Sequence, residues 1–112
     1  MGELLNKKCE PCKKGSPQIT EAEALQHLSE LPDWEQIDLE GINRLRRIFT
    51  FPNFVEAVAF TNKVAQISEQ EGHHPAILTE WGKVTVTWWT HAIKGLHTND
   101  FIMAAKTDEL IG

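Results

Sequence analysis

Histidine is the residue type in this chain with the clearest chemical potential. His73 and His74 stand together before Pro75, and His91 ends a run of β-branched and aromatic residues. Imidazole titrates near neutral pH, so several imidazoles at one mouth could hold, protonate and deprotonate a polar heterocycle. Each histidine also has a structural interpretation, because a pair before proline can cap a strand and a strand-end histidine can simply face solvent. The residues alone leave both interpretations open.

Two further residue types near the histidines bear on a site. Asp100 lies in the first turn of a predicted helix, where the helix dipole favours a carboxylate. A helix-start aspartate can equally do no more than satisfy backbone amides. Trp88 and Trp89 point to opposite faces of a predicted strand, so one belongs to the core and the other can line a pocket or an interface. The remaining histidines, His27 and His97, are predicted surface residues.

A metal site formed by the three histidines is not favoured. Adjacent histidines chelate poorly on a regular backbone, and no acidic ligand stands at a typical spacing. The chain contains no glycine-rich phosphate loop and no G-x-S-x-G sequence. We therefore predict a site with no metal and no cofactor.

The two cysteines, Cys9 and Cys12, have the C-x-x-C spacing of half a zinc site or of a redox pair. Zinc needs two further ligands, and a redox pair sits at the start of a helix after a strand. This pair lies instead in a lysine-rich segment broken by proline. We expect an exposed, reduced pair, with adventitious or intermolecular metal binding as the alternative.

Composition places the chain among ordinary soluble proteins. Its 112 residues suffice for one core, and 41% of them are hydrophobic and 24% charged. The net charge of −5 argues against a general affinity for nucleic acids or anionic membranes. No segment approaches the roughly 20 apolar residues of a membrane span, and no apolar N-terminal signal is evident. The protein is therefore expected to be cytoplasmic, with no nucleic-acid and no membrane partner.

Periodicity and turn residues divide the chain into a tail and one domain. Residues 1–18 are polar and broken by proline and glycine, which predicts a flexible N-terminal tail before a single domain over residues 19–112. Thr20 and Glu23 form a capping box at the start of the first helix, and Leu25, Leu28 and Leu31 follow at helical spacing as its apolar face. The predicted elements are a helix over 20–30, strands over 34–39 and 42–51, a helix over 54–70, strands over 76–79 and 84–91, and a helix from Thr98 or Asn99 to about Leu110.

The order of these elements defines the fold class. Two hairpins interleaved with helices predict an α+β fold, a four-stranded antiparallel sheet with three helices on one face in the order αββαββα. The helix over 54–70 carries an apolar stripe wide enough to cover the sheet and to contact a second subunit. The stripe consists of Phe54, Ala57, Val58, Val64, Ala65 and Ile67. Arg44, Arg46 and Arg47 lie in an alternating run and are predicted to be solvated strand residues or ion-pair partners.

The segment from Glu69 to Asp100 resembles the defining motif of the pterin-4a-carbinolamine dehydratases. That motif consists of an acidic residue, three residues, His-His-Pro, five residues, an aromatic residue, nine residues, a histidine, eight residues and an aspartate. The chain keeps every gap, with the specified residues at Glu69, His73, His74, Pro75, Trp81, His91 and Asp100. The order of elements upstream is similar to the family too, so the resemblance extends over about residues 18–112.

The resemblance implies dehydration of 4a-hydroxytetrahydrobiopterin to quinonoid dihydrobiopterin and water, a lyase reaction that recycles tetrahydropterin for aromatic amino acid hydroxylases. It implies acid–base catalysis by His73 and His91 in undecided roles, while His74 orients the pterin. Substrate binding is further assigned to Pro75, Trp89, Thr90, Asp100 and Glu69. Among these, Pro75 would fix the turn and Asp100 would orient or charge-tune a histidine. Family members form homodimers or homotetramers through sheet edges and the long helix.

Two positions depart from the pattern of many family members. Gly72 replaces an acidic residue directly before the histidine pair, and Asn99 replaces an arginine directly before the final aspartate. Both changes remove charge near the site, which is expected to weaken pterin binding.

A non-catalytic role on the same scaffold is the alternative function. Animal members also act as coactivators by sharing the dimerisation helix of a transcription factor. Such a protein-binding module would use the apolar face around Phe54, Val58 and Ala65 instead of the histidines. Because a pure adaptor has no need of three imidazoles, the complete motif favours the enzyme.

Overall fold

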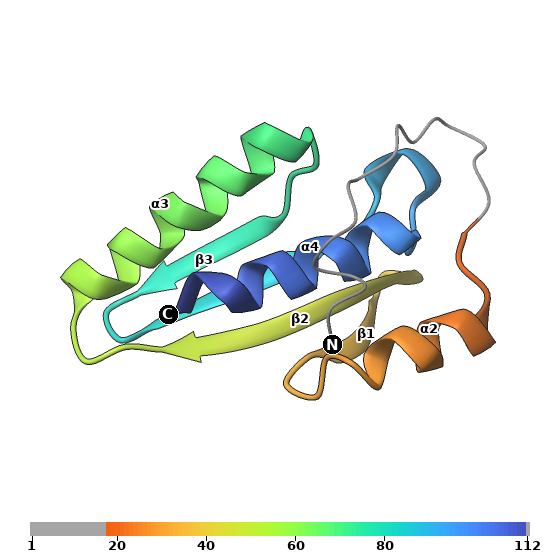
Figure 1. Ribbon diagram of the computed structural model, residues 1–112, viewed down its shortest axis with the longest axis horizontal. Coiled ribbons are helices and arrows are strands. Elements are labelled where there is room, and N and C mark those ends of the chain that lie inside the picture. The colour runs from red at the N-terminus through yellow and green to blue at the C-terminus, as the bar shows by residue number, and fades with distance from the viewer. Residues whose placement is uncertain (1–17, 112) are drawn as a thin grey trace.

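The helices and strands of the chain follow the predicted αββαββα order in a computed structural model, which describes residues 18–111 (Figure 1). They are α2 (Glu21–Leu28), β1 (Glu35–Leu39), β2 (Ile42–Thr50), α3 (Phe54–Glu71), β3 (Ala76–Glu80), β4 (Lys83–Trp88), the 3-10 turn η1 (His91–Ile93), α4 (Thr98–Asp108) and the 3-10 turn η2 (Glu109–Ile111). The predicted tail, with Cys9 and Cys12, lies outside the described residues apart from Gln18. The side-chain amide of Gln18 donates to the carbonyl oxygen of Ile93 at 3.1 Å.

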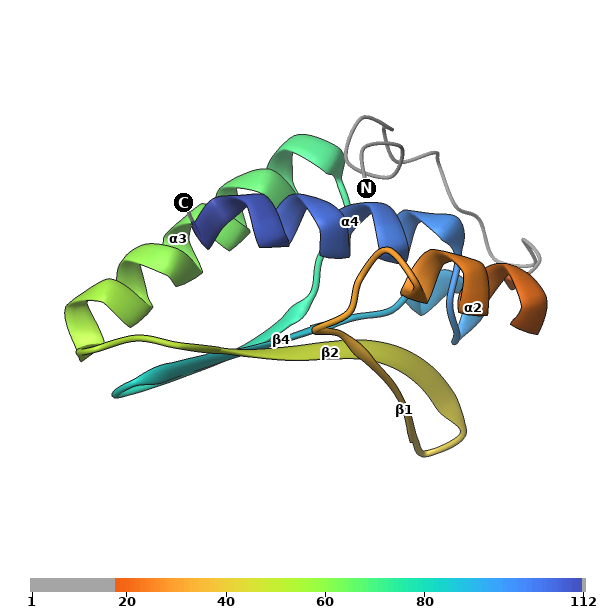
Figure 2. The ribbon, with the colours of Figure 1, turned by 60° about the horizontal axis from the view of Figure 1, so that its bottom comes forward.

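The four strands form one antiparallel sheet in the order β1-β2-β4-β3. β2 and β4 lie at its centre, with Leu45 opposite Trp88 and Phe49 opposite Val84. All three helices lie over one face, and within residues 18–111 no helix covers the other (Figure 2). The predicted α+β architecture is therefore confirmed.

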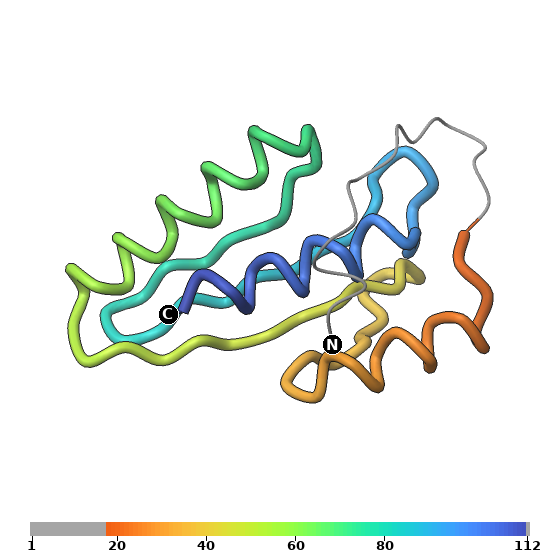
Figure 3. Tube along the Cα trace, viewed as in Figure 1, coloured from red at the N-terminus to blue at the C-terminus, as the bar shows by residue number. Residues whose placement is uncertain are grey.

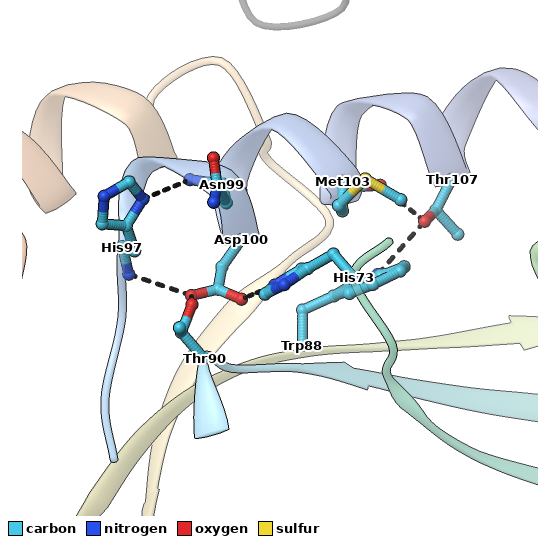
Figure 4. Close-up of polar contacts among 8 residues, drawn as sticks. All are labelled: His73, Trp88, Thr90, His97, Asn99, Asp100, Met103 and Thr107. Carbon is cyan, nitrogen blue, oxygen red and sulfur yellow. Dashed lines mark hydrogen bonds and ion pairs between the residues drawn. The ribbon is translucent and has the colours of Figure 1, made fainter. Parts of the chain in front are cut away.

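The core lies between the central strands and helix α4. Leu45, Val86 and Trp88 are fully buried there, as is Phe101 of α4, and the removal of their apolar surface from water stabilises the packing. The indole Nε1 of Trp88 donates to the hydroxyl of Thr107 at 3.1 Å, which satisfies the one polar atom of that side chain (Figure 4). Trp88 is therefore the core member of the tryptophan pair.

The alternating pattern predicts a strand that runs to His91, but strand β4 ends at Trp88. The chain leaves the sheet because the N–H of Thr90 donates to the carbonyl oxygen of Gly95 at 2.8 Å, which closes a loop. His91 opens the turn η1 inside this loop, and the connection between β4 and α4 doubles back on itself (Figure 3). Strand propensity is thus overridden by a local closure that the residue types do not reveal.

Two helix residues differ from the predicted apolar faces. Leu25 of α2 is 64% exposed, because Ala24 and Leu28 form the row that faces the core. The predicted stripe of α3 omits Phe60, which is buried against Phe49 with ring centroids 4.6 Å apart. The buried apolar residues of α3 are Ala57, Phe60 and Val64, so Phe60 adds an aromatic contact to the predicted core-facing row.

Asp108 ties the end of α4 to the sheet and to the start of β1. Its Oδ1 accepts hydrogen bonds from Trp34 Nε1 at 2.8 Å and from Arg47 Nη1 at 2.7 Å. Arg46 pairs with Glu35 at 2.6 Å, so these two arginines are ion-pair partners as predicted. Burial raises the pKa of the Asp108 carboxyl above its ordinary 3.8, although both hydrogen bonds act to lower it.

The raised pKa of Asp108 predicts a pH-dependent contribution to stability. Because the folded state holds this proton more tightly than the unfolded state, the free energy of unfolding should fall as pH rises from 3.8 through the folded-state pKa. In Asp108→Asn the amide oxygen can still accept both hydrogen bonds, but nothing titrates at this position. Urea unfolding between pH ~3.5 and ~6 should therefore show the variant gaining stability relative to wild type as pH rises. A difference independent of pH would contradict this account.

Candidate active site

The carboxylate of Asp100 is fully buried and accepts three hydrogen bonds. Oδ2 accepts from the backbone N–H of His97 at 2.9 Å and from the Thr90 hydroxyl at 2.8 Å, while Oδ1 contacts Nε2 of His73 at 2.7 Å (Figure 4). A buried carboxylate is costly unless such donors surround it. With Asp100 ionised, the proton of His73 lies on Nε2, so the imidazole donates this hydrogen bond and the carboxylate accepts it.

The end of helix α3 places His73 in this pair. Gly72 takes the left-handed conformation, with φ of 65°, and the N–H of His73 donates to the carbonyl oxygen of Ser68 at 3.1 Å. This is the Schellman ending that glycine favours. The imidazole then stacks on Trp88, with ring centroids 5.6 Å apart and an interplanar angle of 7°. The helix stop that the sequence predicts at Gly72 therefore also aims the histidine.

Nδ1 of His73 is the ring nitrogen left available for chemistry. This atom makes no hydrogen bond among residues 18–111. The side-chain atoms there that are both buried and without a hydrogen-bond partner are Nδ1 of His27 and Nε of Arg44, and Nδ1 of His73 is not among them. The side chain of His73 is 11% exposed, so Nδ1 retains access to solvent. One nitrogen is thus held by Asp100 while the other can exchange a proton.

His97 is a capping residue and not the simple surface residue that we predict from the sequence. The N–H of Asn99 donates to its Nδ1 at 3.1 Å, so the neutral ring carries its proton on Nε2. The backbone N–H of His97 also donates to the Asp100 carboxylate, and these two hydrogen bonds make His97 the N-cap of α4. The signal was present, because a polar residue three positions before an acidic one is a capping pattern. His27 is likewise half-buried, against Phe101.

His91 and Trp89 form a second group beside the first. Their ring centroids are 4.5 Å apart, and the guanidinium of Arg44 lies 4.2 Å from the centroid of the Trp89 ring. His91 is exposed, and within residues 18–111 its imidazole makes no hydrogen bond or ion pair. The structure thus does not join His91 to the His73–Asp100 pair by a direct contact. The two groups are neighbours through the peptide bond between Thr90 and His91.

The remaining predicted site residues lie where α3 meets β3. Nε2 of His74 contacts the Glu69 carboxylate, and both side chains are largely exposed. Pro75 is half-buried and leads into β3. In the described part of the chain, no group of three or more His, Cys, Asp or Glu side chains could hold a metal ion. None of the helices described there is long and apolar enough to cross a membrane.

Comparison with protein families places the chain in a known family. The model of the pterin 4 alpha carbinolamine dehydratase family matches residues 17–110. The chain belongs to this family. Its match covers every element of the sheet together with both groups of candidate site residues.

Individual relatives agree with the family assignment. A protein of Marinobacter nauticus that is named for this dehydratase is 58% identical over 110 residues, which cover 98% of this chain and 99% of that protein. Among solved structures, a transcriptional coactivator/pterin dehydratase from Brucella melitensis is 30% identical, with a TM-score of 0.77 over 86% of this chain and all of that one. A pterin dehydratase-like protein identified as a RuBisCO assembly factor in the alpha-carboxysome is 26% identical, with a TM-score of 0.61 over 71% of this chain and 90% of that one. The family scaffold is therefore associated with more than one role.

Replacing Asp100 by asparagine should reverse its hydrogen bond with His73. The amide oxygen can still accept from the His97 N–H and the Thr90 hydroxyl, so the amide NH2 must donate to Nε2. The proton of neutral His73 then moves to Nδ1, and loss of the charged hydrogen bonds should lower the free energy of unfolding by about 1–3 kcal/mol. Nitrogen NMR of isotope-labelled histidine should show the tautomer of His73 change and that of His97 stay the same. An Nε2-protonated His73 in the variant would contradict the assigned geometry.

Proposed function

We propose that the protein dehydrates 4a-hydroxytetrahydrobiopterin to quinonoid dihydrobiopterin and water. The observation that carries the proposal is the contact between His73 and Asp100, because it holds one nitrogen of a motif imidazole and leaves the other free. Membership of the pterin dehydratase family supports the reaction class. The product would be reduced again to tetrahydropterin, which serves aromatic amino acid hydroxylases.

The proposed reaction needs two proton transfers. The hydroxyl on C4a must be protonated to leave as water, and a ring N–H must lose its proton so that the new double bond can form. His73 and His91 are proposed to act as the acid and the base, in an order that is open. Each such transfer typically contributes about 10²–10⁴-fold to the rate. The chemistry involves no change of redox state, and the proposal includes neither a metal nor a cofactor.

The neighbouring residues fit supporting roles in this scheme. Asp100 would orient His73 and direct its proton transfer to Nδ1. His74, exposed beside Glu69, is proposed to bind and orient the pterin, with Pro75 fixing the turn that carries it. Trp89 and Thr90 would line the pocket on the side of His91. A homodimer or homotetramer remains part of the prediction.

A protein-binding role is the second candidate. Phe54 and Val55 at the start of α3 are 49% and 78% exposed, and two structural relatives are named as a coactivator and as an assembly factor. This candidate would replace the first if the protein had no dehydratase activity and bound a defined partner in a manner lost in Phe54→Ser. An active enzyme whose rate is unchanged in Phe54→Ser favours the first.

Removal of either proposed acid–base histidine should slow dehydration. His73→Ala and His91→Ala should each reduce kcat by at least about tenfold, because each removes one proton transfer. The rate is followed by absorbance, with 4a-hydroxytetrahydropterin generated enzymatically. His27→Gln is the matched control, since His27 lies on α2 and its Nδ1 has no hydrogen bond to lose. Wild-type rates in both alanine variants, with circular dichroism unchanged, would remove the mechanism.

A further inference from the structure

Arg44 is the arginine of residues 18–111 that has no carboxylate partner. Arg46 pairs with Glu35, and Arg47 pairs with Asp108. The guanidinium of Arg44 makes one hydrogen bond, from Nη2 to the carbonyl oxygen of Leu39 at 3.3 Å, and its Nε is buried without a partner. Guanidinium carries five N–H donors. Most of the donor capacity of this cation is therefore unused.

The position of Arg44 connects it with the candidate site. Strand alternation places it on the sheet face opposite to Leu45, the face that the described helices leave uncovered. Its guanidinium packs on Trp89 at 4.2 Å, and Trp89 packs on His91 at 4.5 Å. These two distances place the guanidinium carbon within about 9 Å of the imidazole centroid. A bicyclic heterocycle with a side chain can span that separation.

Trp89 also prepares Arg44 for binding. The cation–π contact and the bond to Leu39 hold the guanidinium in one place, so little freedom remains to be lost when a ligand arrives. A planar guanidinium with free donors suits carboxylate and phosphate oxygens. The chain as a whole has a net charge of −5 and repels anions, whereas the unpaired guanidinium near His91 attracts them locally.

We propose that Arg44 binds an anionic group on the substrate, so that the pterin this protein processes carries a phosphate or carboxylate on its side chain. The pterin ring would lie against His91, and the anionic group would reach the free donors of Arg44. This inference rests on the proposed function for the reaction itself. It keeps that reaction and changes the substrate, from biopterin with its neutral dihydroxypropyl side chain to a pterin whose side chain carries an anionic group.

Dehydration kinetics with three substrates test the inference. The 4a-hydroxytetrahydro forms of a pterin with a neutral dihydroxypropyl side chain, of its phosphate ester and of a carboxylate analogue are compared. An anionic substrate should have a KM at least about tenfold lower than the neutral one. Arg44→Gln should remove this difference and leave kcat, and KM for the neutral substrate, within about twofold. Whether the phosphate ester or the carboxylate shows the effect identifies the group.

Arg46→Gln is the matched control, because Arg46 lies on the same strand and face but is already paired with Glu35. It should leave all three KM values unchanged. Equal KM values for neutral and anionic substrates in the wild type would overturn the inference. So would an Arg44→Gln variant that raises KM for neutral and anionic substrates alike, since that result indicates a purely structural role.

A binding measurement separates this inference from the proposed function. The fluorescence of an oxidised, unreactive pterin phosphate reports binding without turnover, in wild type and in Arg44→Gln. Binding that depends on Arg44 in a protein without dehydratase activity would reject the enzyme and keep the anion site. Activity on the neutral pterin with no dependence on Arg44 would keep the enzyme and reject the anion site. Neither activity nor binding would reject both.

Discussion

The buried carboxylate of Asp100 is the interaction on which the site depends. A charge taken out of water costs several kcal/mol unless hydrogen bonds replace its hydration, and here the donors come from three parts of the chain. Thr90 follows β4, His97 begins α4, and His73 follows α3. The carboxylate therefore fixes the ends of these elements relative to one another. It also places an imidazole on the core tryptophan, Trp88.

Strand alternation divides the site between the two faces of the sheet. Trp88 points under α4 and carries the stacked ring of His73, whereas Trp89 turns to the uncovered face and carries His91 and Arg44. Two consecutive residues, the last of β4 and the first after it, thus support two different chemical environments. One is enclosed and held by a carboxylate, and the other is open to solvent. A substrate that contacts both histidines has to approach the end of β4, where the strand gives way to the loop.

The sequence predicts the scaffold better than it predicts this division. Capping residues, glycine stops and alternation suffice for the element order and for the place of Asp100 in the first turn of α4. They do not reveal that β4 stops at Trp88, because a bond between Thr90 and Gly95 decides that point. They also do not reveal the contact of Arg44 with Trp89, since those residues lie far apart in sequence and meet only across β2 and β4. Residue types report local preference, while such pairings depend on register.

The enclosed pair of Asp100 and His73 and the exposed His91 give different kinds of evidence for function. Asp100 and His73 are bound into the core, so their loss would destabilise the protein whether or not it is an enzyme. Their presence alone therefore does not separate an enzyme from a binding module, and the feature that fits proton transfer is the ring nitrogen of His73 that Asp100 leaves free. The side chain of His91 is exposed, and within residues 18–111 its imidazole makes no hydrogen bond and contacts the ring of Trp89. A histidine in that position contributes little to folding, and proton transfer is the property for which imidazole is suited. The exposed imidazole of His91 is therefore an argument for catalysis that is independent of fold stability, and it adds to the argument from the contact between His73 and Asp100.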